Sequence, residues 1–285
     1  MLIKEFFDQA TFTLTYVVYD QNTKDAIVID PVWDYDPASS KLSTASAQNV
    51  LSFLKENNLN LHYILETHAH ADHISGAQII KAEYPNSKIV IGSEITKVQS
   101  VFKKLYNLDS SFMVDGSQFD YLIKNGEQIR AGSIQIKAIA TPGHTPACSS
   151  YLIDNCLFVG DSLFMPDSGT GRCDFPEGSA DQLYNSIHEV IYSLPEDTRV
   201  YVGHDYQPHG RPLKFITSVF ESKNSNIQLK GATTKEEYIK FRTERDRVLT
   251  APRLLLPSIQ VNINAGKLPA PESNGSSYLK IPLFR

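Results

Sequence analysis

The sequence is short of cysteine, of positive charge and of long apolar runs, and each shortage excludes a class of protein. The three cysteines, Cys148, Cys156 and Cys173, are too few and too widely spaced for a disulfide framework or a zinc ribbon, which suits a reducing compartment. The net charge of -5 and the lack of a Lys/Arg-rich block argue against a nucleic-acid partner. No apolar stretch approaches the roughly 18 residues of a membrane-spanning helix.

The N-terminus and the length of the chain set further limits. Residues 1–7 carry an acidic side chain early and lack a clean apolar stretch before a small-residue cleavage site, so we expect no signal peptide. With few cysteines and no such leader, the expected location is the cytoplasm. A chain of 285 residues is long enough for one large domain or two small ones with a sizeable core.

Two kinds of apolar pattern alternate along the first 204 residues. Short runs that are rich in β-branched and aromatic residues, or that alternate with period two, predict strands over 12–20, 26–30, 61–65, 88–91, 134–139, 150–153, 157–159 and 199–202. Apolar residues at helical spacing predict helices over 45–57, 74–84, 94–106 and 178–194. This alternation favours an α/β protein with helices packed outside its sheets.

The sequence changes character after His204. Residues 214–221 and 234–250 are predicted to be helical, whereas the proline-rich tail from residue 251 onward is expected to be irregular. Such a tail suits an arm that wraps around the body or contacts a second subunit, so a homodimer is the expected assembly; the alternative is a poorly ordered terminus. We therefore divide the chain into residues 1–212 and 213–285.

A dense group of metal-binding side chains directly follows the predicted strand 61–65. Within six positions the chain places three histidines and an aspartate: His68, His70, Asp72 and His73. Imidazole and carboxylate are the groups that bind zinc and iron. A solvated turn that is histidine-rich by chance is the alternative, but four such residues in a loop that leaves a strand are hard to explain structurally. The segment therefore predicts a metal site.

Three further candidate ligands lie far apart in the sequence, and each follows a predicted strand. His144 comes after residues 134–139, Asp161 after 157–159 and His204 after 199–202. Strand ends are rigid, and the loops that leave them are free to carry function. Pro-Gly-His or Gly-Asp alone would indicate only a turn, but together and in this order these residues extend the predicted metal site.

This order of ligands resembles the metallo-β-lactamase superfamily, whose motifs are His-x-His-x-Asp-His, Gly-His, a bridging Asp and a final His. The resemblance runs from about Phe12 to His204. It implies an αββα sandwich of two packed mixed β-sheets with helices outside, formed by 1–212, and a C-terminal extension, 213–285, that packs on the same domain. It also implies up to two metals, one with His68, His70, His144 and Asp161 and the other with Asp72, His73, Asp161 and His204.

The loop that follows Asp161 narrows the resemblance. Its Gly-x-Gly-Arg-x-Asp-Phe stretch, residues 169–175, is similar to the persulfide (sulfur) dioxygenases, as are His204-Asp205-Tyr206 and residues 251–271. The segment 213–250 resembles longer bacterial members that are called β-lactamase-like hydrolases. The resemblance implies one Fe(II) per chain, held by His68, His144 and Asp161, and oxidation of glutathione persulfide by O₂ to sulfite and glutathione, a sulfide-detoxifying reaction. His70, Asp72, His73 and His204 would then support the site or form a second one.

An alternative interpretation uses all seven ligands. Glyoxalase II, the nearest relative of the persulfide dioxygenases, is a thioester hydrolase with two zinc ions, and Zn(II) is able to bind the same side chains as Fe(II). The sequence contains both the full dinuclear set and the three-residue iron set, so counting ligands does not choose between them. A metal-binding protein without enzymatic activity is a third hypothesis, which the complete ligand set disfavours.

Two residues are candidates for contact with the substrate. The guanidinium of Arg172 would bind a carboxylate of glutathione, or else form a structural ion pair with Asp174. The hydroxyl of Tyr206 would donate to the substrate or to O₂, or else belong to an ordinary rim tyrosine. Cys148 is expected to be a packing residue, whereas Cys173 shares the Arg172 loop and would be open to oxidation if it were exposed.

Overall fold

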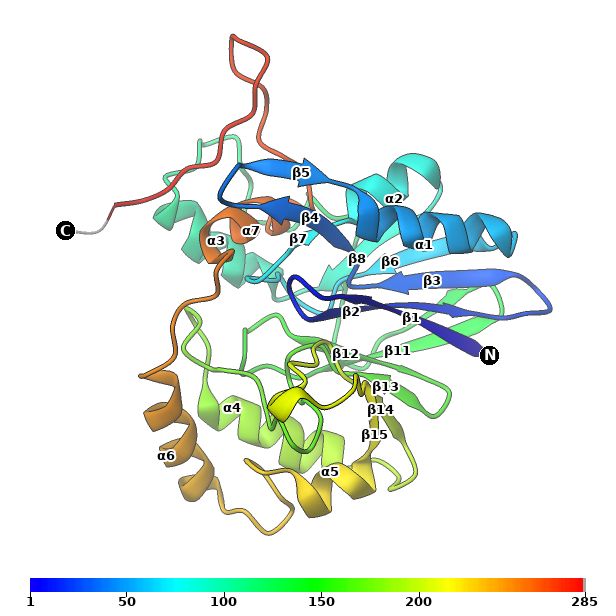
Figure 1. The fold of residues 1–285 in the computed structure, drawn as a ribbon, viewed down its shortest axis with the longest axis vertical. Coiled ribbons are helices and arrows are strands. Elements are labelled where there is room, and N and C mark those ends of the chain that lie inside the picture. Colours follow the sequence, from blue (N-terminus) through cyan, green and yellow to red (C-terminus); the bar gives the residue numbers. More distant parts are fainter. Residues whose placement is uncertain (284–285) are drawn as a thin grey trace.

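The computed structural model describes residues 1–283 and contains two six-stranded sheets packed face to face (Figure 1). In the first sheet, an antiparallel part is extended by a parallel part that begins where β3 pairs with β6. Its strand order is β1 (Leu2–Asp8), β2 (Thr13–Tyr19), β3 (Asp25–Ile29), β6 (Asn60–Leu65), β8 (Lys88–Gly92) and β9 (Tyr121–Ile123).

The second sheet is antiparallel except for the parallel pair β13 and β14. Its order is β10 (Gln128–Ala131), β11 (Ile134–Ala140), β12 (Ser149–Ile153), β13 (Cys156–Phe158), β14 (Arg199–Tyr201) and β15 (Ile216–Ser218). A small three-stranded sheet lies beside these two and consists of β5 (Lys41–Ser43), β4 (Val32–Asp36) and β7 (Ile74–Ser75).

Helices cover the outer faces of both sheets, which confirms the predicted αββα sandwich. Figure 1 shows α1 (Ala45–Glu56), α2 (Ala77–Glu83) and α3 (Ile95–Leu105) on the side of the first sheet. The side of the second sheet carries α4 (Ala180–Asn185), α5 (Val219–Ser225) and α6 (Lys235–Asp246). Beyond them, α7 (Leu255–Asn262) returns to the first side and lies against β7.

Residue alternation in β2 explains why the two layers pack as they do. Leu14, Tyr16 and Val18 point into the core between the sheets, where they meet apolar residues of the second sheet. Val17 points to the other face and packs under the helices α1–α3. Because successive side chains of a strand lie on opposite faces, a strand that is apolar on both faces belongs in the middle of such a sandwich.

The structure corrects three predictions of secondary structure. Residues 214–221 are not one helix: Ile216–Ser218 pairs with β14 as the edge strand β15 before α5 begins. The proline-rich tail contains α7, which accommodates Pro257 at its third residue, where the missing amide hydrogen costs nothing. The helix predicted over 178–194 continues beyond Asn185 as a turn of π-helix, Ser186–Val190, and a turn of 3₁₀-helix, Ile191–Ser193.

Within residues 1–283, none of the helices combines the length and the apolar character that crossing a bilayer requires. The division at residue 212 and the homodimer stay predictions. The segment after residue 212 nevertheless supplies β15 to the second sheet, and α6 packs beside α4. It also reaches the site described next.

Candidate metal centre

All seven predicted ligands meet at one edge of the sandwich. The loops that follow β6, β11, β13 and β14 carry them there, because these strands end at the same edge of their sheets. Six of the seven are buried, with at most 8% of the residue exposed, and only Asp72 is half-buried. A buried gathering of histidines and carboxylates is costly unless a metal or ion pairs compensate it, so the geometry fits a metal centre.

Three of these residues form a group of their own. The nearest ligand atoms of His68, His144 and Asp161 all lie within 4.8 Å of one another. The Nε2 atom of His144 is 3.7 Å from Oδ2 of Asp161, and the rings of His68 and His144 stand almost perpendicular with their centroids 5.0 Å apart. Two imidazoles and one carboxylate on one side leave the other side free for exogenous ligands.

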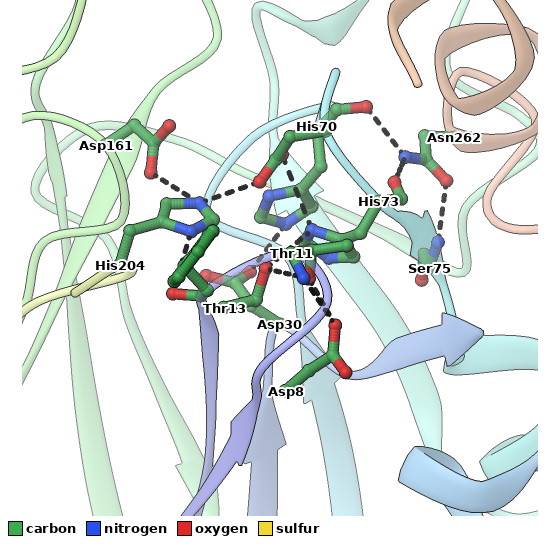
Figure 2. A network of polar contacts seen from close by, with 12 residues as sticks. Asp8, Thr11, Thr13, Asp30, His70, His73, Ser75, Asp161, His204 and Asn262 are labelled. Atoms are coloured by element: carbon green, nitrogen blue, oxygen red, sulfur yellow. Dashed lines mark hydrogen bonds and ion pairs between the residues drawn. The ribbon is translucent and has the colours of Figure 1, made fainter. Parts of the chain in front are cut away.

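The remaining four predicted ligands lie beside this group. His70, Asp72 and His73 form a second cluster of ligand atoms within 4.8 Å. His204 connects the two groups, because its Nε2 lies 3.2 Å from Oδ1 of Asp161 and 3.1 Å from Oδ2 of Asp72 (Figure 2). The structure therefore brings all seven residues together in two adjoining groups, with the ring centroids of His68 and His70 4.1 Å apart.

Buried polar atoms without partners test whether this site fits a metal. Among the described residues, nine buried side-chain nitrogen or oxygen atoms make no hydrogen bond, and five of them belong to the predicted ligands. They are His68 Nε2, His70 Nδ1, Asp72 Oδ2, His73 Nε2 and Asp161 Oδ1. Because buried polar groups are nearly always satisfied, such a concentration of unsatisfied lone pairs fits cation binding.

The other ring nitrogen of each histidine is held by the protein. Nδ1 of His144 lies 2.8 Å from the carbonyl oxygen of Arg172, and Nδ1 of His204 lies 3.2 Å from that of Phe12. Nδ1 of His68 lies 3.0 Å from the Thr67 hydroxyl. Partners of this kind fix the tautomer and the orientation of a metal-binding imidazole, so the rings are prepared for a metal.

The charges of the site fit the same interpretation. Burial lowers the pKa of His68 well below its ordinary value, which keeps the ring neutral and able to donate its lone pair. Burial also disfavours the charged form of His204, but the carboxylates of Asp161 and Asp72 outweigh burial and raise its pKa to about 9. A metal cation bound near Asp161 and Asp72 would compensate the charge of these carboxylates in place of the proton on His204.

Two carboxylates that no motif in the sequence marks, Asp30 and Glu66, hold His70. Its Nε2 lies 3.0 Å from Oδ1 of Asp30 and 3.1 Å from Oε2 of Glu66, and both carboxylates are buried. Asp30 also accepts hydrogen bonds from the amide and hydroxyl of Thr67, from a left-handed backbone conformation with φ 49°. An acidic residue that ends one strand and another that precedes the histidine cluster were the available signals.

A third residue that no motif marks, Asn262, comes from the end of α7. Its side-chain Nδ2 donates 2.8 Å hydrogen bonds to the carbonyl oxygens of His70 and His73, and its Oδ1 accepts a 2.8 Å bond from the amide of Ser75 (Figure 2). Asn262 is 4% exposed. Both amide hydrogens and the amide oxygen of Asn262 thus bind the loop that carries the histidines, although Asn262 lies 187–192 positions away in sequence.

We expect Asn262→Ala to weaken metal binding. The substitution leaves two buried carbonyl groups and one amide without partners, which costs about 1–3 kcal/mol of stability, and a loosened ligand loop lowers metal affinity by roughly 10- to 100-fold. Titration of the loaded protein with a chelator measures the affinity. Asn264→Ala is the matched control, since among residues 1–283 the Asn264 side chain bonds only the nearby Lys267 carbonyl; equal metal retention by both variants would contradict this role.

A cavity of about 550 Å³ opens onto the metal centre. His144, Asp161 and Asp72 line it, together with both candidate substrate residues, Arg172 and Tyr206. The ring of Tyr206 is stacked on that of His204 with centroids 5.7 Å apart. Arg172 forms the ion pair with Asp174 that was its structural alternative, with Nε 2.6 Å from Oδ1, and it also faces the cavity.

The Arg172 loop approaches the metal centre closely, which explains the glycine at position 171. A Cβ atom on Gly171 would lie 2.0 Å from the carbonyl oxygen of Asp161 and 3.5 Å from Cβ of His144.

Cys173 in the same loop is buried, and burial raises the pKa of its thiol, so it is not the exposed, oxidisable residue that its loop position allowed. Cys148 is also buried, with its pKa raised to about 12, and packs as expected.

Comparison with known proteins identifies the family. The model of the metallo-beta-lactamase superfamily matches residues 9–204, so the chain belongs to this superfamily, and the fold and the order of ligands agree with it. The crystal structure of ETHE1 from Myxococcus xanthus is similar over 94% of this chain and 100% of that chain, with a TM-score of 0.74 and 29% sequence identity.

Two relatives carry names that point to different reactions. Glyoxylase B2 of Dictyostelium discoideum is 50% identical over 99% of this chain and 96% of its own length. The mitochondrial persulfide dioxygenase ETHE1 of Homo sapiens is 32% identical over 85% of this chain and 80% of its own length. The predicted resemblance to persulfide dioxygenases is thereby confirmed, whereas the reaction of this chain is a matter for proposal.

Proposed function

We propose that the protein is a persulfide dioxygenase that uses one Fe(II) to oxidise glutathione persulfide. The observation that carries this proposal is the group of His68, His144 and Asp161, of which His144 and Asp161 line the cavity. His70 lies beside this group, with its ring centroid 4.1 Å from that of His68 and its Nδ1 without a hydrogen bond, as the dinuclear alternative requires. The 32% identity to the human persulfide dioxygenase supports the proposal.

The reaction balances as persulfide, O₂ and water giving thiol, sulfite and two protons. Iron held by His68, His144 and Asp161 would supply the redox chemistry that couples a persulfide to O₂, which side chains alone do not provide. Three ligands that leave adjacent positions free are the arrangement that non-haem iron needs for this purpose. The same side chains accept Zn(II), so the metal is part of the proposal.

The cavity residues would orient the substrate and limit the access of water. Phe12 and Phe164 pack against the ring of Tyr206 at centroid distances of 5.7 and 5.8 Å and form an apolar part of the wall. The Tyr206 hydroxyl makes no hydrogen bond to the described residues, so it is available to donate to the substrate or to O₂. The Arg172 carbonyl fixes the His144 ring, so this residue acts on the site even with its side chain paired.

A dinuclear thioester hydrolase of the glyoxalase II type is the second candidate. Two observations favour it: all seven ligands are present and close together, and glyoxylase B2 is 50% identical to this chain. In such an enzyme, a hydroxide activated by the metals would attack the thioester carbonyl.

One comparison separates the two functions. Protein loaded with Fe(II) and protein loaded with Zn(II) are each given glutathione persulfide in air and, separately, S-lactoylglutathione. We expect sulfite from the iron form alone and slow thioester hydrolysis by either form. Rapid hydrolysis by the zinc form, without sulfite from the iron form, would replace the dioxygenase by the hydrolase.

A further inference from the structure

The cavity that reaches the metal centre is lined by four arginines as well as by metal ligands. Arg172 belongs to the loop beside Asp161, whereas Arg242, Arg245 and Arg253 come from the segment after residue 212. This segment lies outside the residues that match the superfamily model. Guanidinium groups on the wall of a concave site attract and concentrate anions. The cavity wall therefore carries negative side chains at Asp72 and Asp161 and positive side chains at the four arginines.

Two of the four arginines are already committed to the protein. Arg242 is 1% exposed, and its guanidinium bonds Asp246, Gln228 and the carbonyl oxygen of Thr170. Each of the three guanidinium nitrogens of Arg172 donates a hydrogen bond, two of them to Asp174 and one to the Thr250 carbonyl. The bond to Thr250 holds the chain just before Arg253 against the Arg172 loop.

The other two arginines are free to bind a ligand. Within residues 1–283, the side chains of Arg245 and Arg253 form neither an ion pair nor a hydrogen bond, and both are exposed. Arg245 lies in the last turn of α6, and Arg253 lies between α6 and α7. Arg253 also lines a neighbouring cavity of about 290 Å³, which shares Ala10, Thr11 and Leu254 with the first. Arg253 therefore lies at the boundary between the two cavities.

We propose that Arg245 and Arg253 bind the anionic group of the thiol that carries the persulfide. The planar guanidinium matches a carboxylate or a phosphate with two parallel hydrogen bonds. A carrier thiol would place its sulfur at the metal and its anionic group against these two arginines, so that each end of the molecule binds a group of opposite charge. The C-terminal segment would thereby select the carrier. The identity of the ligand as a persulfide carrier rests on the proposed function, whereas the anion site itself rests on the cavity.

Binding without turnover tests this proposal. Zinc-loaded protein is titrated calorimetrically, in the absence of O₂, with glutathione, with its diethyl ester, which lacks both carboxylates, and with coenzyme A, which carries phosphates. The variants are Arg245→Gln, Arg253→Gln and the double variant. Arg247→Gln is the control, because Arg247 is an exposed neighbour that does not line the cavity.

We expect each single substitution to weaken glutathione binding roughly tenfold, as the loss of a charge-assisted hydrogen bond does, and the double substitution to weaken it further. Binding of the ester should stay within about twofold throughout, and Arg247→Gln should behave as wild type. If coenzyme A alone shows the dependence on the arginines, the anion is a phosphate and the site stands.

Two results would overturn the proposal. In the first, the double variant binds glutathione and coenzyme A as tightly as wild type. In the second, it loses affinity for the ester as much as for glutathione, which would indicate an altered cavity rather than a lost charge contact. Failure of the dioxygenase function is distinguishable, because it would abolish sulfite formation and leave arginine-dependent binding in place.

Discussion

Substitution of His144 by alanine is expected to remove the metal and the activity together while the fold persists. His144 belongs to the group formed with His68 and Asp161 and lines the cavity, and its loss leaves a single imidazole beside Asp161 in that group. A bound metal contributes several kcal/mol of transition-state stabilisation, so activity should fall by at least about a thousandfold. Metal content by elemental analysis and circular dichroism measure the two halves of this prediction.

His62→Ala is the matched control for that experiment. His62 lies in β6, the strand that leads to the histidine loop, but its Nε2 pairs with Oδ1 of Asp25 at 2.6 Å, away from the metal centre. This variant should keep its full metal content and activity. An active, metal-replete His144→Ala protein would show that the ligand assignment is wrong.

Substitution of Arg242 by methionine is expected to cause the largest loss of stability. Arg242 and Asp246 form an ion pair in which both residues are buried, and Oδ2 of Asp246 accepts a 2.8 Å hydrogen bond from the amide of Cys173. Removal of the cation leaves a buried carboxylate without its partner, which costs about 3–5 kcal/mol. Urea unfolding monitored by tryptophan fluorescence measures the change in the free energy of unfolding.

Two comparisons make this stability prediction specific. Arg247→Met alters an exposed arginine one residue beyond Asp246 and should change stability by no more than about 0.5 kcal/mol. Addition of Asp246→Asn to Arg242→Met removes the unpaired charge and should restore part of the lost stability. A loss below 1 kcal/mol in Arg242→Met would mean that this pair does not anchor α6 to the Arg172 loop.

The seven candidate ligands could be recognised from the sequence because their signals are local. Three histidines and an aspartate within six positions, followed by single ligands after later strands, identify the site without knowledge of tertiary contacts. Most of the central strands and the helices α1–α3 were predicted for a similar reason: periodicity within each element reports which face is buried. The strands β1, β4, β5, β9 and β10 were not predicted. A strand that is buried on both faces, such as β2, shows no alternation, and its continuous apolar run predicts the strand instead.

The parts that sequence analysis missed depend on distant partners. Asn262 has no local pattern, because its role arises only when α7 packs beside β7 and presents the side chain to His70, His73 and Ser75. The edge strand β15 forms because β14 offers it free hydrogen-bonding groups, which override a helical spacing. The two free arginines of the cavity are unremarkable in sequence and become significant only on its wall.

The division of the seven ligands into two groups also depends on tertiary structure. In the sequence, His70 is as good a candidate ligand as His68, and the His-x-His-x-Asp-His motif is compatible with both the single-iron site and the dinuclear zinc site. In the structure, the carboxylates of Asp30 and Glu66 lie within about 3 Å of His70 Nε2, whereas Nδ1 of His68 lies beside the Thr67 hydroxyl, and each ring keeps its other nitrogen without a hydrogen bond. Buried acids that hold one histidine of a cluster have no signature in spacing alone.

The most direct test of this account is an oxygen-electrode measurement on protein purified without O₂ and loaded with one Fe(II) per chain. Addition of glutathione persulfide should start O₂ uptake, with one sulfite formed for each O₂ consumed, and His144→Ala should show neither. Absence of O₂ uptake by the iron-loaded wild type, together with rapid hydrolysis of S-lactoylglutathione by the zinc-loaded protein, would contradict the account and assign the site to a dinuclear hydrolase.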